Sequence, residues 1–137
     1  RFVIFAVEGN SFGISLPLVD RVLRAVEITV LPQSAPGVMG IINLHGRATP
    51  ILDLRTDIGL TSKEVGVNDL IIIARHEKRS IGLLADSVEG VRTFPQDKIV
   101  HRADQTIFRQ LAIPEEQIIL ICDIIALTER MDLSIAA

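Results

Sequence analysis

Tryptophan and tyrosine are absent from the sequence, and five phenylalanines are its only aromatic residues. Proteins that recognise single-stranded nucleic acid need exposed rings beside basic side chains, because the bases stack on those rings. Basic residues are also in the minority, since 14 Lys and Arg face 17 Asp and Glu and leave a net charge of −3. Both observations argue against nucleic acid as the partner of this protein.

Cysteine occurs once, at position 122, so the chain cannot form an internal disulfide and has no cysteine pair of metal-binding spacing. Cys122 lies in an apolar run, where a thiol stays protonated and unreactive, and we interpret it as a core residue. The longest apolar runs, such as 70–74, are too short to cross a bilayer, so we expect no direct membrane insertion. These features favour the reducing cytoplasm, although residue 1 is arginine and a targeting segment could have preceded it.

Isoleucine and valine, in contrast, are abundant, with 20 and 12 residues respectively. Side chains branched at Cβ pack well on pleated sheets, which favours a mainly β fold. The pattern predicts about ten short strands, from 2–7 to 117–122, followed by a C-terminal amphipathic helix. Short strands with frequent turns are typical of barrels and sandwiches, and the length of 137 residues predicts a single domain, 1–137.

Local signals place several structural residues within this pattern. After Pro17, the apolar spacing over residues 19–23 fits one short helical turn. Asp53 is expected to cap a short helix, and Asp123 is expected to cap the final helix. We expect Gly46 to adopt a positive φ in a hairpin turn and Gly40 to allow close approach of another backbone.

An internal repeat is the sharpest feature of the sequence. Residues 13–22 superpose on residues 82–91 without a gap, and both segments share a glycine followed by Val-acid-x-Val. Residues 51–54 match residues 121–124 at nearly the same offset. These matches predict a duplicated unit, with two small β-subdomains packed about a pseudo-twofold axis. The expected bounds are roughly 12–68 and 69–120, with an exchange of the terminal segments between them left open.

Catalytic readings of the same residues are weaker. Asp53 and Asp123 could form an aspartic dyad of the kind found in duplicated proteases, but neither acid is followed by the glycine turn that such a dyad needs. The three histidines lie in separate predicted turns, which does not favour a metal site or base catalysis. We therefore expect a binding module without catalytic residues, cofactor or metal, and keep a hydrolase that uses the two aspartates as a remote alternative.

Residues 40–55, with the sequence GIINLHGRATPILDLR, resemble the CheW family of bacterial chemotaxis coupling proteins. The signature of that family reads roughly G-x-x-N-L-R-G-x-x-x-P-[VI]-[VIL]-D-L-R. Similarity also extends over 12–22 and 82–88, so that it covers most of 2–94 and returns at 119–127. Fixed Gly, Asn, Pro and Asp positions over such a length make the resemblance specific.

The resemblance implies a pair of five-stranded SH3-like barrels, with short helices and a C-terminal helix, packed through a shared apolar core. It also implies a non-enzymatic adaptor that couples chemoreceptors to the histidine kinase CheA without a cofactor. The expected partners are the regulatory domain of CheA and the cytoplasmic tip of methyl-accepting chemoreceptors. The same domain recurs inside CheA and in CheV-type fusions, so a regulatory domain excised from such a longer protein remains an alternative.

Candidate partner-binding residues follow from the same resemblance. Receptors bind the family in a groove between the subdomains, and plain core packing is the alternative reading for its apolar residues. In this chain the residues that match the groove are Val19, Val22, Val88 and Val91.

Two further positions depart from the family. It usually carries an acid at the position of Arg21 and an arginine at that of His45, and these two side chains could form a salt bridge. Both have changed here, and the two changes are mutually compatible because an unchanged arginine would repel Arg21. Arg21 and His45 are therefore added to the candidate partner-binding residues.

Overall fold

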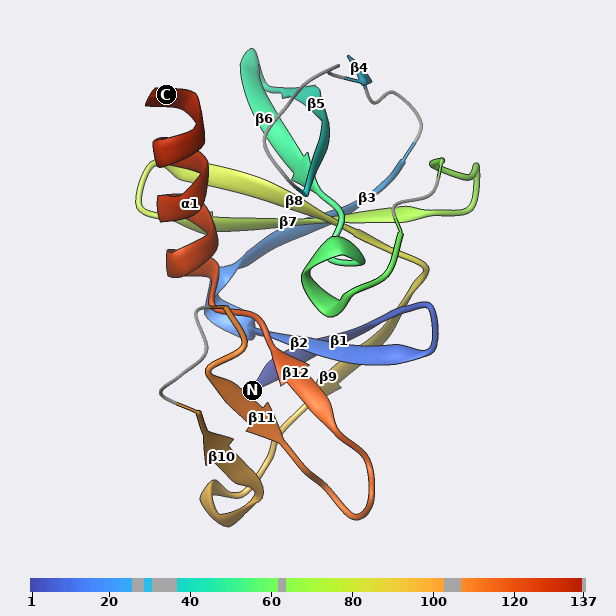
Figure 1. Ribbon diagram of the computed structural model, residues 1–137, viewed down its shortest axis with the longest axis vertical. Helices are drawn as coiled ribbons and strands as arrows, with labels where there is room; N and C mark the ends of the chain where they lie inside the picture. The colour runs from blue at the N-terminus through green and yellow to red at the C-terminus, as the bar shows by residue number, and fades with distance from the viewer. Residues whose placement is uncertain (26–28, 31–36, 62–63, 103–106, 137) are drawn as a thin grey trace.

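The computed structural model describes residues 1–25, 29–30, 37–61, 64–102 and 107–136. Within these residues the chain forms two sheets and one α-helix, which confirms a mainly β fold with a C-terminal helix (Figure 1). The strands are β1 (Phe2–Val7), β2 (Asn10–Ser15), β3 (Val19–Arg24), β4 (Thr29–Val30), β5 (Val38–Leu44), β6 (Arg47–Leu52), β7 (Leu70–His76), β8 (Arg79–Ala85), β9 (Ser87–Arg92), β10 (Ile99–His101), β11 (Gln110–Ala112) and β12 (Ile119–Ile121). The helices are the 3₁₀ turns η1 (Leu16–Leu18), η2 (Thr56–Ile58) and η3 (Gln96–Lys98), and α1 (Ile124–Ala136).

Each sheet combines strands from both halves of the chain. Sheet A has the order β10-β11-β12-β2-β1-β9, and sheet B has the order β3-β7-β8-β6-β5-β4. The first hairpin, β1–β2, therefore lies in sheet A, whose other strands come from the second half, and the hairpin β7–β8 lies in sheet B (Figure 1). The expected bounds of 12–68 and 69–120, with an exchange of the terminal segments left open, stay a prediction, and the strand orders show only that each sheet takes strands from both halves of the chain.

The number of strands also differs from expectation. Each sheet has six strands in the described residues, whereas the family resemblance implied five. The additional members are short edge strands, since β4 has two residues and β10 has three. Residues 19–24 form β3 instead of the expected helical turn, because they pair with β7 and only η1 before them is helical.

The two sheets repeat the same geometry. In sheet B, parallel pairing of β6 and β8 places Ile51 opposite Gly82. In sheet A, parallel pairing of β12 and β2 places Ile121 opposite Gly13. A Cβ atom on Gly82 would overlap Ile51, and one on Gly13 would lie 2.9 Å from Cδ1 of Ile121. Glycine at both positions leaves room for the facing isoleucine side chains, and the matching contacts support the predicted duplication.

Buried residues form three clusters. Successive residues of β1 point in opposite directions, so that Ile4 packs in a small cluster within sheet A while Phe5 packs between the sheets. Sheet B has a corresponding inner cluster that includes Ile51 and Ile73. The large cluster, called the shared core below, also receives Leu127 of α1, which packs against β7 and β8. Two sheets that each enclose a core and share a third are consistent with fused SH3-like barrels.

Candidate interaction surface

The four candidate valines lie on the edge strands of the two sheets. β3 is the first strand of sheet B and β9 is the last strand of sheet A, so each has one side without a neighbouring strand in the described residues. Val19 is the first residue of β3 and Val88 is the second residue of β9, and both are half-buried against the shared core. Val22 and Val91 lie three residues further along, and their exposed fractions are 41% and 53%.

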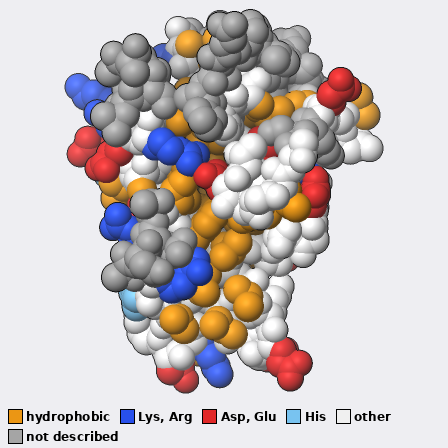
Figure 2. Space-filling model, in the orientation of Figure 1, with side chains coloured by type: hydrophobic (Ala, Val, Ile, Leu, Met, Phe, Trp, Pro, Cys, Tyr) orange, Lys and Arg blue, Asp and Glu red, His pale blue; other side chains and the backbone are white. Residues whose placement is uncertain are grey.

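This difference separates two roles that the sequence left together. Val19 and Val88 contribute to the packing that joins the sheets, whereas Val22 and Val91 present apolar surface to solvent. All four obey the repeat, because the two strands carry the same Val-x-x-Val spacing. Figure 2 shows further hydrophobic side chains over the lower half of the molecule, where sheet A lies in Figure 1. An apolar edge strand can accept a partner through both its side chains and its backbone.

The two positions that depart from the family form a direct contact. Nη1 of Arg21 lies 2.9 Å from Nε2 of His45. A guanidinium has no acceptor, so Arg21 donates this hydrogen bond and Nε2 of His45 accepts it. Nε of Arg21 also lies 3.3 Å from Oδ2 of Asp20, and the Arg21 and His45 side chains are exposed. Because Arg21 is on β3 and His45 is in the turn after β5, the contact joins the first strand of sheet B to the opposite part of the same sheet.

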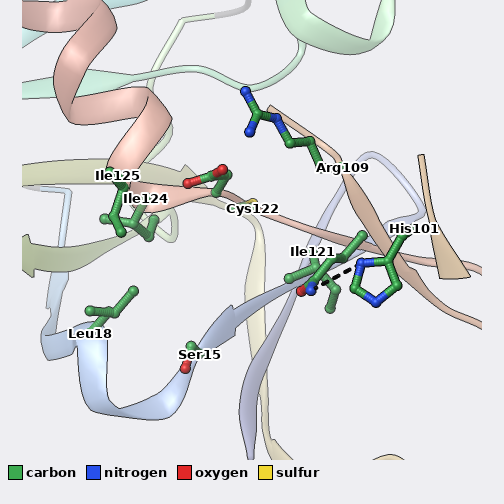
Figure 3. A pocket seen from close by; sticks show the side chains of 10 residues that line it. Ser15, Leu18, His101, Arg109, Ile121, Cys122, Ile124 and Ile125 are labelled. Carbon is green, nitrogen blue, oxygen red and sulfur yellow. Dashed lines mark hydrogen bonds between the residues drawn. The ribbon is translucent and has the colours of Figure 1, made fainter. Parts of the chain in front are cut away.

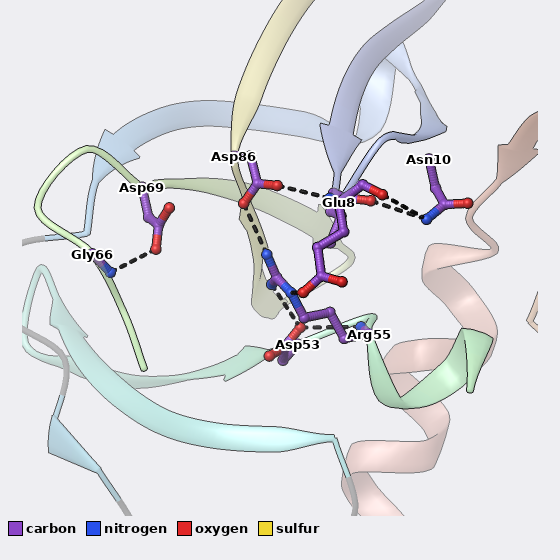
Figure 4. Close-up of polar contacts among 8 residues, drawn as sticks. Glu8, Asn10, Asp53, Arg55, Gly66, Asp69 and Asp86 are labelled. Carbon is purple, nitrogen blue, oxygen red and sulfur yellow. Dashed lines mark hydrogen bonds and ion pairs between the residues drawn. The ribbon is translucent and has the colours of Figure 1, made fainter. Parts of the chain in front are cut away.

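A buried arginine joins the two sheets, and the sequence did not single it out. Arg55 is 0% exposed, and its guanidinium donates to three carboxylates. The distances are 2.7 Å from Nε to Oε1 of Glu8, 3.1 Å from Nη1 to Oδ1 of Asp53, and 2.9 Å from Nη2 to Oδ1 of Asp86 (Figure 4). Glu8 lies in the β1–β2 turn of sheet A, whereas Asp53 and Arg55 follow β6 of sheet B.

The charges of this cluster reinforce one another. Burial alone would lower the pKa of Arg55, but its hydrogen bonds to Glu8 and Asp53 outweigh burial and raise that pKa above its ordinary value. The backbone N–H of Glu8 also donates to Oδ2 of Asp86 over 2.7 Å. Arg55 therefore remains a cation and fixes the β1–β2 turn against the chain that leaves sheet B. Its signal in the sequence was the Asp-x-Arg pattern after a buried strand.

The two aspartates with predicted helix caps have different roles. Asp53 does not cap η2, because its Oδ1 accepts hydrogen bonds from the backbone and the side chain of Arg55. Asp123 does cap α1, since the backbone N–H of Ala126 donates to its Oδ1 over 3.0 Å. Oδ1 of each carboxylate is thus engaged by a structural partner of its own, Arg55 for Asp53 and the Ala126 N–H for Asp123.

Gly46 adopts the positive φ expected of it, whereas the close backbone approach expected at Gly40 stays a prediction. Gly46 has a φ of 82° in the β5–β6 turn, next to His45 with a φ of 51°. Gly40 is buried in β5, where it pairs with Ile51 on one side and with Val30 on the other.

An open cavity of about 330 Å³ lies where β10, β11 and β12 meet the start of α1 (Figure 3). Its lining includes Cys122, and burial raises the pKa of that thiol far above its ordinary value. His101 and Gln110 lie within hydrogen-bond distance of each other at this cavity (Figure 3). Across the described ranges, no cluster of three His, Cys, Asp or Glu residues is placed to hold a metal ion. In the same ranges, no helix combines the length and the apolarity needed to span a membrane.

Comparisons with known proteins agree with this architecture. The chemotaxis protein CheW of Bacillus subtilis is 28% identical over 119 residues, which cover 87% of this chain and 76% of that protein. The chemotaxis protein CheW of Rhizobium meliloti is 31% identical over 93 residues, or 68% of this chain and 60% of that protein. The protein PilI of Pseudomonas aeruginosa is 30% identical over 93 residues, or 68% of this chain and 52% of that protein.

A solved structure shows the same fold. The scaffolding protein TtCheW from Thermoanaerobacter tengcongensis superposes with a TM-score of 0.77 at 24% sequence identity, covering 89% of this chain and 87% of that one. The model of the CheW-like domain family matches residues 1–131. The chain therefore belongs to the CheW-like domain family, whose members include chemotaxis scaffolding proteins.

Proposed function

We propose that the protein is a cytoplasmic, non-enzymatic adaptor that couples chemoreceptors to the histidine kinase CheA. The observation that carries the proposal is the pair of edge strands, β3 and β9, which display equivalent exposed valines on two fused barrels. A partner strand or helix that covers Val22 and Val91 gains apolar contact without unfolding either barrel. The kinase's regulatory domain and the receptor's cytoplasmic tip are the partners that the family resemblance suggests.

The rigidity of the surface supports a scaffold. Val19 and Val88 anchor the two edge strands in the shared core, and the Arg55 cluster fixes the turn that precedes β2. An interface that is already ordered loses little conformational entropy when a partner binds. Modest apolar area with a polar rim favours an association that is specific and reversible.

Partner choice is expected to depend on Arg21 and His45. The hydrogen-bonded pair, with Asp20 beside Arg21, places a guanidinium and an imidazole where the family usually carries an acid and an arginine. Exposed charges at an interface influence specificity and association rate more than affinity. We therefore propose that the chain recognises a CheA whose regulatory domain is matched to this altered charge.

The experiment is a calorimetric titration of the chain with the regulatory domain of the CheA encoded in the same organism. We expect binding by the natural chain and a clear loss of affinity in the double variant Arg21→Glu, His45→Arg. A second titration measures the affinity of the chain for the receptor tip. The double variant Val22→Ser, Val91→Ser is expected to lower this affinity. Val67→Ser, which changes an exposed valine outside the strands, is expected to leave the affinity unchanged. Absence of binding to either partner at high micromolar concentration would refute the proposal.

The alternative, a regulatory domain excised from a longer CheA or CheV-type protein, uses the same surface. The reading frame that encodes the chain distinguishes the two, because a fused kinase or receiver domain would assign the regulatory role.

A further inference from the structure

A second cavity, of about 180 Å³, opens at one end of sheet B. It lies between the start of β6, the start of β8 and α1. The two strands pair in parallel at Ile51–Gly82 and Leu52–Leu83. Residues 47–50 and 78–81, which precede these pairs in the chain, line the cavity, and Thr128 and Met131 of α1 close its inner side.

Burial divides the lining into an inner floor and an outer mouth. Ile81 and Met131 of the floor are 1% and 4% exposed, so the floor is largely apolar. Two hydroxyl residues, Thr49 and Thr128, are also buried in the lining. The Thr128 hydroxyl donates to the backbone carbonyl of Ile125 over 2.8 Å, so its oxygen remains able to accept.

The mouth is cationic. Arg47, Lys78 and Arg79 line it with exposed side chains, and among the lining residues whose side chains the structure describes there is no acid. Nη1 of Arg47 donates to the backbone carbonyl of Lys78 over 3.2 Å, which holds the guanidinium beside the opening. Arg79 also interacts with another group, so Arg47 and Lys78 are the two cations that we assign to the ligand. Such a concentration of positive charge is distinct from the chain as a whole, whose net charge is −3.

We propose that this cavity binds a compact carboxylate, with a branched aliphatic or aromatic group on the floor and the carboxylate at Arg47 and Lys78. The volume is below the 300–1,000 Å³ usual for drug-sized ligands, and it suits one group of the size of a leucine or phenylalanine side chain. Arginine and lysine at the rim of an apolar site bind carboxylates through charge-assisted hydrogen bonds. A free carboxylic acid and the C-terminal residue of a peptide share this chemistry.

The test is a titration of the isotope-labelled full chain followed by NMR. N-acetyl-leucine mimics a peptide C-terminus, isovalerate is a free branched acid, and N-acetyl-leucinamide is a neutral control of nearly the same shape. We expect saturable shifts of the methyl groups of Ile81 and Met131 with at least one acid, and about tenfold weaker binding of the amide. Preference for N-acetyl-leucine over isovalerate identifies a peptide terminus as the ligand, and the reverse preference or equal binding identifies a free acid.

Matched variants separate the cavity from general charge. The double variant Arg47→Gln, Lys78→Gln is expected to lose about tenfold in affinity for the acids. Arg75→Gln is the control, since this exposed arginine lies on the same hairpin but outside the cavity lining. The proposal is overturned if no probe gives saturable shifts at about 10 mM, if the amide binds as well as the acids, or if the double variant behaves like the control. None of these results depends on binding to CheA or to a receptor.

Discussion

Arg21 and His45, two side chains that can each carry a positive charge, lie 2.9 Å apart and form a hydrogen bond across the ends of sheet B. The guanidinium donates and Nε2 of the imidazole accepts. An arginine in place of His45 would instead face Arg21 with two like charges. We therefore expect the two positions to be energetically coupled.

A double-mutant cycle on these positions measures that coupling. His45→Arg alone is expected to lower the free energy of unfolding by about 0.5 kcal/mol, because it places two guanidinium groups together at an exposed site. Arg21→Glu in the same chain is expected to recover the loss by forming an ion pair. Urea denaturation of the four proteins gives the coupling energy, and strictly additive effects would contradict the contact.

Among the charged residues, those of the Arg55 cluster are expected to contribute most to the free energy of unfolding. Arg55→Met leaves the fully buried carboxylate of Asp53 without its cation, which is expected to cost about 3–5 kcal/mol. Arg55→Lys is also expected to destabilise, because a single ammonium cannot reproduce a fork that reaches three carboxylates. Urea denaturation is the measurement, with Arg75→Met as an exposed control, and an Arg55→Met loss below that of the control would disprove the role.

Replacing the two glycines of the repeat, Gly13 and Gly82, by alanine is expected to destabilise the protein to different extents. Gly82→Ala is expected to lower the free energy of unfolding by about 1–3 kcal/mol, because the new Cβ would overlap two isoleucine side chains of sheet B. The loss in Gly13→Ala is expected to be smaller. Gly66→Ala serves as the control, since Oδ2 of Asp69 would lie at an ordinary contact distance of 3.5 Å from its new Cβ. Thermal unfolding ranks the three variants, and equal melting temperatures would argue against close packing at the parallel strand pairs.

Cys122 gives the protein a pH dependence on the alkaline side. Burial raises the pKa of the thiol in the folded chain, so the unfolded chain ionises first and the contribution of the thiol to stability falls as pH rises above about 8.5. The stability of the natural chain relative to Cys122→Ala is expected to fall by about 1.4 kcal/mol for each pH unit above that point. Denaturation series at pH 7 to 10 test this, and a constant difference would place the thiol in contact with solvent.

The sequence predicted the local elements better than their assembly. Strands such as β1 and β7 were evident from their apolar residues, and the turn at Gly46 from its residue types. The helical turn expected at 19–23 was wrong because an i, i+3 spacing of valines also suits an edge strand that pairs with β7. The exchange of hairpins depends on parallel pairing between distant segments, which leaves no mark in any local pattern.

The candidate site shows the same division. The four valines were found from a resemblance, but the structure was needed to separate the half-buried pair, Val19 and Val88, from the exposed pair, Val22 and Val91. Asp53 was interpreted as a helix cap because capping is a local interaction. Its actual partner, Arg55, also binds Glu8 and Asp86, which lie 47 and 31 positions from Arg55 in the sequence. Long-range ion pairs of this kind become visible only when the chain is folded.

The exchanged hairpins have a consequence for how the molecule unfolds. Because each barrel borrows two strands from the opposite half of the chain, we expect the two barrels to unfold together. The two candidate edges, β3 and β9, are then expected to belong to one cooperative unit.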